Sequence, residues 1–61
     1  MIYRYVLHLA GPDGTRSLRW TFVRPISEHD VVNLATLGSW RVVRAVSGED
    51  GDSGYLYCEP V

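Results

Sequence analysis

Residues 2–24 read IYRYVLHLAGPDGTRSLRWTFVR, two runs of alternating apolar and polar residues on either side of one turn. Alternation with a period of two is typical of a strand that buries one face. The large side chains that share a face are Tyr3, Tyr5, Leu7 and Leu9 in the first run and Leu18, Trp20 and Phe22 in the second. Gly11 to Gly14 supply the turn between them, so the stretch predicts a β-hairpin.

The register of this hairpin follows from its apolar pattern, because a slip of one residue would send every side chain to the opposite face. Placing Ala10 opposite Thr15 leaves the four-residue loop Gly11 to Gly14 and pairs Leu7 with Leu18, Tyr5 with Trp20 and Tyr3 with Phe22. A three-residue loop would instead put Leu7 opposite Arg19. We therefore predict the four-residue loop, with Arg4 and Arg19 together on the outer face.

A second hairpin is predicted near the end of the chain. Trp40 to Val46 is a strand with apolar residues on both faces, namely Trp40, Val42 and Val46 on one and Val43 and Ala45 on the other. After the polar stretch Ser47 to Gly54, Tyr55 to Val61 forms its partner, with Leu56 and Cys58 on one side and Tyr55, Tyr57 and Glu59 on the other. If Ser47 pairs with Gly54, Arg44 lies opposite Tyr57.

The segment from Pro25 to Gly38 admits two interpretations. Ser27 followed three residues later by Asp30, with Gly38 beyond, is a pattern of helix caps and predicts a short helix near residues 28–37. The β-branched residues of the segment are weak helix formers, and they favour a strand over residues 31–37.

The pattern as a whole resembles the small SH3-like barrels. The likeness rests on the first hairpin, a "DVV" strand start at Asp30 to Val32, a Gly-Ser turn, "WRVVRAV" from Trp40 to Val46 and a closing strand. It implies a mainly β protein, a five-stranded antiparallel SH3-like barrel that acts as a binding module. The alternative is an α+β fold of the ββαββ type, with a short helix near residues 28–37.

Composition bounds the class of protein. Sixty-one residues with 46% hydrophobic content predict one small packed domain, residues 1–61, of marginal stability. Cys58 is the one cysteine, so no internal disulfide forms, which suits a reducing compartment and predicts a cytoplasmic protein. No apolar run approaches the roughly 20 residues of a membrane span, and no targeting segment is visible. Self-association or a permanent partner would add buried area.

No set of residues for catalysis or metal binding converges in the sequence. Ser27, His29 and Asp30 have the residue types of a hydrolase triad, but neighbours in sequence cannot form its hydrogen-bonded line. Cys58 alternates with Leu56 and is expected in the core. The acidic stretch Ser47 to Gly54 lacks the spacing of a calcium loop. We therefore predict a protein that is not an enzyme and needs no cofactor or metal.

A binding surface is the remaining prediction. Its candidate residues are Arg4, Arg19, Arg44, Tyr55 and Tyr57, all expected on the outer face of the sheet. Arginine and large aromatic side chains anchor protein interfaces, so we predict a protein-interaction module that binds another protein or itself. The alternative is a small barrel that binds nucleic acid through the same arginines, although a net charge of −1 is low for that role.

Overall fold

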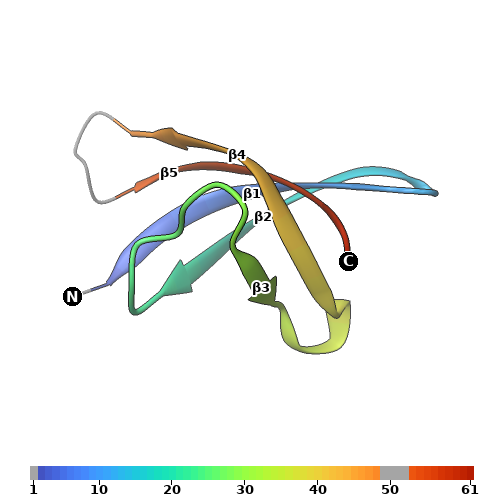
Figure 1. Ribbon diagram of the computed structural model, residues 1–61, viewed down its shortest axis with the longest axis horizontal. Coiled ribbons are helices and arrows are strands. Elements are labelled where there is room, and N and C mark those ends of the chain that lie inside the picture. The colour runs from blue at the N-terminus through green and yellow to red at the C-terminus, as the bar shows by residue number, and fades with distance from the viewer. Residues whose placement is uncertain (1, 49–52) are drawn as a thin grey trace.

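The computed structural model describes residues 2–48 and 53–61, and it contains one curved β-sheet (Figure 1). The strands are β1 (Tyr3–Gly11), β2 (Gly14–Phe22), β3 (Val31–Asn33), β4 (Ser39–Ser47) and β5 (Ser53–Pro60). In the sheet they follow the order β2-β1-β5-β4-β3. A mainly β fold with five strands is thus confirmed.

The first hairpin has the register that its apolar pattern predicts. Ala10 pairs with Thr15, Leu7 with Leu18, Tyr5 with Trp20 and Tyr3 with Phe22. Gly11 and Gly14 also pair, which leaves Pro12 and Asp13 as the turn itself, and Gly14 has a φ of 118° that favours glycine. The prediction succeeds because only one register puts every large side chain of both strands on one face.

The sheet differs from the predicted antiparallel barrel in two respects. First, β1 and β5 run parallel, so the sheet is mixed. Second, β2 and β3 form the two edges and do not pair with each other, so the sheet curls into a half-barrel that stays open on one side. Between these two edges the chain passes through residues 23–30, which form no strand, and β3 itself has three residues.

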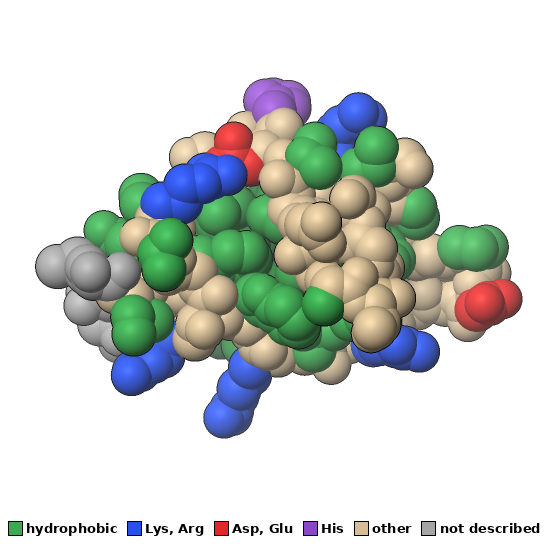
Figure 2. All heavy atoms as spheres, turned by 90° about the horizontal axis from the view of Figure 1, so that it is seen from below, with side chains coloured by type: hydrophobic (Ala, Val, Ile, Leu, Met, Phe, Trp, Pro, Cys, Tyr) green, Lys and Arg blue, Asp and Glu red, His purple; other side chains and the backbone are tan. Residues whose placement is uncertain are grey.

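The core fills the inner side of this half-barrel. Its buried side chains are Leu7, Leu9, Ile26, Val32, Leu34, Val42, Leu56 and Cys58, and all are hydrophobic. Leu18, Trp20 and Phe22 of β2 pack against them but are only partly buried, because β2 lies at the edge. Figure 2 views the molecule from below, the side of Figure 1 on which β2 and β3 lie, and hydrophobic side chains remain visible there.

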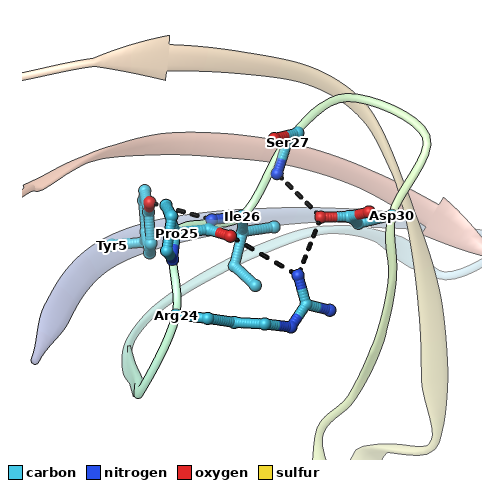
Figure 3. Close-up of polar contacts among 6 residues, drawn as sticks. All are labelled: Tyr5, Arg24, Pro25, Ile26, Ser27 and Asp30. Carbon is cyan, nitrogen blue, oxygen red and sulfur yellow. Dashed lines mark hydrogen bonds and ion pairs between the residues drawn. The ribbon is translucent and has the colours of Figure 1, made fainter.

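The helix near residues 28–37 does not form, and that alternative is wrong. The strand interpretation is correct only for Val31–Asn33, since a single 3-10 turn follows at Ala35–Leu37. The capping residues are still used, because the Asp30 carboxylate accepts hydrogen bonds from the Ser27 N–H at 2.9 Å and from Arg24 at 3.1 Å (Figure 3). These residues close one turn, and His29 then adopts a φ of 77°. A right-handed helix needs a negative φ, so the helix does not extend past this residue.

The connector that holds this turn is tied to β1. The Ile26 N–H donates to the hydroxyl of Tyr5 at 3.1 Å, and the Ile26 side chain is buried. The backbone then joins β4, because the His29 N–H donates to the Val42 carbonyl and the Val42 N–H donates to the Asp30 carbonyl, both at 2.8 Å. Residues 25–30 therefore cover one end of the core without regular secondary structure.

A bulge in β4 changes the predicted facing of its second half. The register shifts between Val42 and Arg44, so Val43 has no direct partner. Ala45 consequently pairs with the buried Leu56, and Val46 pairs with Tyr55 on the outer face. The prediction that Val46 shares a face with Trp40 and Val42 is wrong, because an unbroken alternation cannot reveal one extra residue.

The acidic residues of the predicted loop, Glu49, Asp50 and Asp52, lie outside the described residues. Within the described residues, no helix is long and apolar enough to cross a membrane.

Candidate functional site

The register brings all five predicted binding residues to the outer face of the sheet. We call Arg4, Arg19, Arg44, Tyr55 and Tyr57 the tyrosine–arginine face. Val6 of β1 pairs with Arg19 on one side and with Tyr55 on the other. Tyr57 in turn pairs with Arg44 of β4, as the sequence predicts. The face therefore spans four neighbouring strands.

Both tyrosines are exposed although they lie on a central strand. The exposed fraction is 46% for Tyr55 and 40% for Tyr57. Alternation along β5 explains this, since their neighbours Leu56 and Cys58 point into the core and are 0% and 1% exposed. The sheet thus fixes the backbone of both tyrosines while leaving a large part of each ring in solvent.

A row of contacts fixes the ring of Tyr57. The His8 ring stacks on it with centroids 4.9 Å apart and planes 19° from parallel. The Arg44 guanidinium lies 5.9 Å from the centroid of the same ring, within range of a cation–π contact. His8 Nδ1 is 2.9 Å from the hydroxyl oxygen of Ser17. The row Arg44, Tyr57, His8 and Ser17 therefore crosses β4, β5, β1 and β2.

His8 is the residue of this face that sequence reasoning misses. It also stacks near Tyr55, with centroids 6.0 Å apart and planes 18° from parallel. The alternation of β1 places His8 on the same face as Arg4 and Val6, which was visible in the sequence. The sequence does not reveal the parallel pairing that puts His8 opposite Tyr57, because a hairpin pattern predicts only antiparallel neighbours.

An open groove lies at the end of this face nearest the start of β1. It has a volume of about 850 Å³, and outward-facing residues of its lining include Arg4, Val6, Arg19, Thr21 and Tyr55. Within residues 2–48 and 53–61, no carboxylate forms an ion pair with Arg4, Arg19 or Arg44. The groove accordingly combines two arginine side chains with apolar and aromatic walls.

Ser27, His29 and Asp30, which have the residue types of a hydrolase triad, do not form one. The His29 side chain is 83% exposed and its ion-pair contact is with Glu28, at 3.7 Å. Asp30 is engaged with the Ser27 backbone and Arg24, which together lower the pKa of its carboxyl. Cys58 is buried as predicted, and this burial raises the pKa of its thiol. In the described part of the chain, no cluster of three or more potential metal ligands forms.

Comparison of the chain with family models, curated proteins and solved structures gives no match. The resemblance to SH3-like barrels therefore stays a prediction.

Proposed function

We propose that this protein is a cytoplasmic protein-interaction module and that the tyrosine–arginine face is its contact surface. The observation that supports this most is the state of Tyr57, whose ring has contacts with His8 of β1 and Arg44 of β4 although the residue is 40% exposed. An aromatic side chain that is already immobilised loses little conformational entropy when it binds. Tyr57 is therefore suited to act as an interface anchor.

The partner's chemistry follows from the rest of the face. Arg4, Arg19 and Arg44 favour carboxylates on the partner, and Val6 with the exposed part of Tyr55 favours apolar side chains. A protein surface offers both kinds of group. A second copy of the chain also offers both carboxylates and apolar side chains.

Binding of nucleic acid through the same arginines is the alternative function, and the stacked row argues against it. Nucleic-acid bases stack on the flat face of an aromatic ring. The Tyr57 ring already has His8 against it from the β1 side and Arg44 over it from the β4 side, so a base would have to displace one of them. The edge and hydroxyl of the ring suit a protein partner better.

The test is capture of partners from native lysate by the tagged protein, with and without nuclease, followed by affinity measurement on the recovered partner. We expect a nuclease-resistant protein whose affinity falls about tenfold or more in Tyr57→Ala, as for an interface anchor. Val31→Ala is the matched control, because Val31 is 48% exposed and lies on the edge strand β3.

Two outcomes would contradict the proposal. Recovery that disappears after nuclease treatment, with affinity that falls steeply between about 50 and about 200 mM salt, would indicate nucleic acid. Equal affinity of Tyr57→Ala and the unmodified protein for a nuclease-resistant partner would remove the tyrosine–arginine face from the contact surface.

A further inference from the structure

The edge strand β2 offers a long row of free backbone groups. It pairs with β1 over nine residues without a bulge or a proline. Because Gly11 and Gly14 pair directly across a two-residue turn, the alternation of the ladder turns the N–H and C=O groups of Thr15, Ser17, Arg19 and Thr21 away from β1. Among the described residues, no backbone group from outside β1 bonds to these positions.

The inner side of this edge is apolar and incompletely covered. Leu18, Trp20 and Phe22 pack against the core but stay partly exposed, and hydrophobic side chains are visible on this open side in Figure 2. A cavity of about 230 Å³ lies between the start of β2 and the 3-10 turn, with Arg16, Leu37 and Trp40 in its lining. An added strand would find apolar contacts on its inward positions.

The charge of the edge determines which strand it accepts. β2 carries Arg16 and Arg19 and no acidic residue, and Arg4 lies on the adjacent strand. Two β2 strands paired with each other would bring like charges together, which destabilises a sheet. Acidic side chains at the outward positions of an added strand would instead face Arg19. The arginines therefore disfavour a second copy and favour an acidic segment.

We propose that the free edge of β2 binds an extended acidic segment of a partner protein, which adds to the sheet as a sixth strand and covers the open side of the half-barrel. Its sequence alternates apolar residues facing inward with acidic residues facing outward. This inference rests on the proposed function only in taking the partner to be a protein. Both proposals use Arg19, but the free backbone groups of the β2 edge belong to this inference alone and Tyr57 belongs to the proposed function alone.

The test uses the full chain and a synthetic nine-residue peptide of alternating valine and glutamate, the glutamate peptide. The control is the lysine peptide, in which lysine replaces each glutamate. Amide exchange by NMR is measured at Thr15, Ser17, Arg19 and Thr21. We expect the glutamate peptide to protect these amides, and the lysine peptide to leave them exchanging as in the free protein. The Ser17→Pro variant, which removes one edge donor, should lose the binding while the β1 and β5 amides stay protected.

A charge reversal keeps the test independent of any folding defect. In Arg19→Glu the affinity for the glutamate peptide should fall by about fivefold to tenfold, and affinity for the lysine peptide should appear. Arg41→Glu is the matched control, because it makes the same charge change at an exposed arginine of β4, away from the edge and outside the tyrosine–arginine face. It should leave the affinity for the glutamate peptide within about twofold, since exposed charges that far apart are screened.

Three results would overturn the inference. The first is no protection of the β2 amides by the glutamate peptide, and the second is an equal loss of affinity in Arg19→Glu and Arg41→Glu. The third is protection that rises with protein concentration in the absence of peptide, which would assign the edge to a second copy. If this inference fails while the affinity of a lysate partner still falls in Tyr57→Ala, the proposed function stands. If that affinity falls in neither Tyr57→Ala nor Arg19→Glu, both proposals are contradicted.

Discussion

Gly54 illustrates how one residue limits what the sheet can tolerate. It pairs with Ser47 at the start of β5 and is buried. A Cβ added at this position would collide with the carbonyl oxygen of Val46, which is backbone and cannot rotate away. The site therefore requires glycine for close approach of two strands rather than for an unusual φ.

Gly54→Ala should destabilise the protein by about 1–3 kcal/mol, the usual cost of overpacking. Urea unfolding monitored by tryptophan fluorescence would measure the loss. Gly11→Ala is the matched control, because its added Cβ would meet Trp40 at an ordinary 3.6 Å. Equal midpoints for the two variants would contradict this account of Gly54.

Asp30 gives the stability a defined pH dependence. The Ser27 N–H and the Arg24 guanidinium lower the pKa of its carboxyl below the ordinary 3.8. Since the folded-state pKa is the lower one, this stabilisation is complete above the unfolded-state pKa and is lost as the pH falls through the folded-state pKa.

Asp30→Asn should therefore be less stable than the unmodified protein at pH 7, and the difference should shrink as the pH falls below about 4. Urea midpoints measured across that range would test it. Glu28→Gln is the control, because it removes a carboxylate of the same turn that contacts His29 and not Ser27 or Arg24. A difference between Asp30→Asn and the unmodified protein that stays constant with pH would show that the charge of Asp30 is not involved.

Among the elements, the two hairpins differ in how far the sequence predicts them. The β1–β2 register follows from residues that alternate without interruption, such as Leu7 and Leu18. In β4 the extra residue at Val43 leaves no trace in the pattern, because both faces of that strand carry apolar residues. The outward facing of Arg44 was still predicted correctly, since it was counted from the Ser47–Gly54 end, beyond the bulge.

The segment between the hairpins shows a different limit. Ser27 and Asp30 have the sequence of a helix cap, and the local turn that they stabilise does form. Whether a helix continues depends on what the following residues pack against. Val32 is buried in the core from strand β3 and Leu34 from the position just before the 3-10 turn, so tertiary packing prevails over the capping signal.

The central strand β5 should protect Cys58 from thiol reagents. The Cys58 residue is 1% exposed and packs in the core cluster, so a reagent reaches it only when the core opens. Burial also raises the pKa of its thiol above the ordinary 9.0, which lowers the thiolate fraction at pH 8.

Alkylation of Cys58 by iodoacetamide at pH 8 should be slower in the native protein than in urea by about a hundredfold or more. Rates followed by mass spectrometry would measure this ratio. Leu9→Ala, which removes a contact of the same core, should accelerate the native reaction. Equal rates in buffer and in urea would contradict the buried position of Cys58.

For the whole molecule, the size of the core sets the stability. The eight buried hydrophobic side chains among residues 2–48 and 54–61, together with the open side, give a small hydrophobic contribution, and the single cysteine forms no disulfide to supplement it. We expect a free energy of unfolding of about 3–5 kcal/mol, as is usual for a core of this size. Urea denaturation with linear extrapolation would measure it, and a value above about 8 kcal/mol would contradict the view that the half-barrel is incompletely covered.

The parallel pairing of β1 with β5 has a consequence for how the chain acquires its structure during synthesis. Each hairpin can form from neighbouring residues, but the strands by which the two hairpins pair, β1 and β5, are far apart in the sequence, with Arg4 beside Ser53 and Leu9 beside Cys58. Such distant contacts form slowly compared with local ones. β1 and β2 are therefore translated before β5, and Leu7 and Leu9 stay without their partners Leu56 and Cys58 until β5 has been added. During that interval the apolar face of the first hairpin is exposed, which is the condition under which a chain is prone to aggregate.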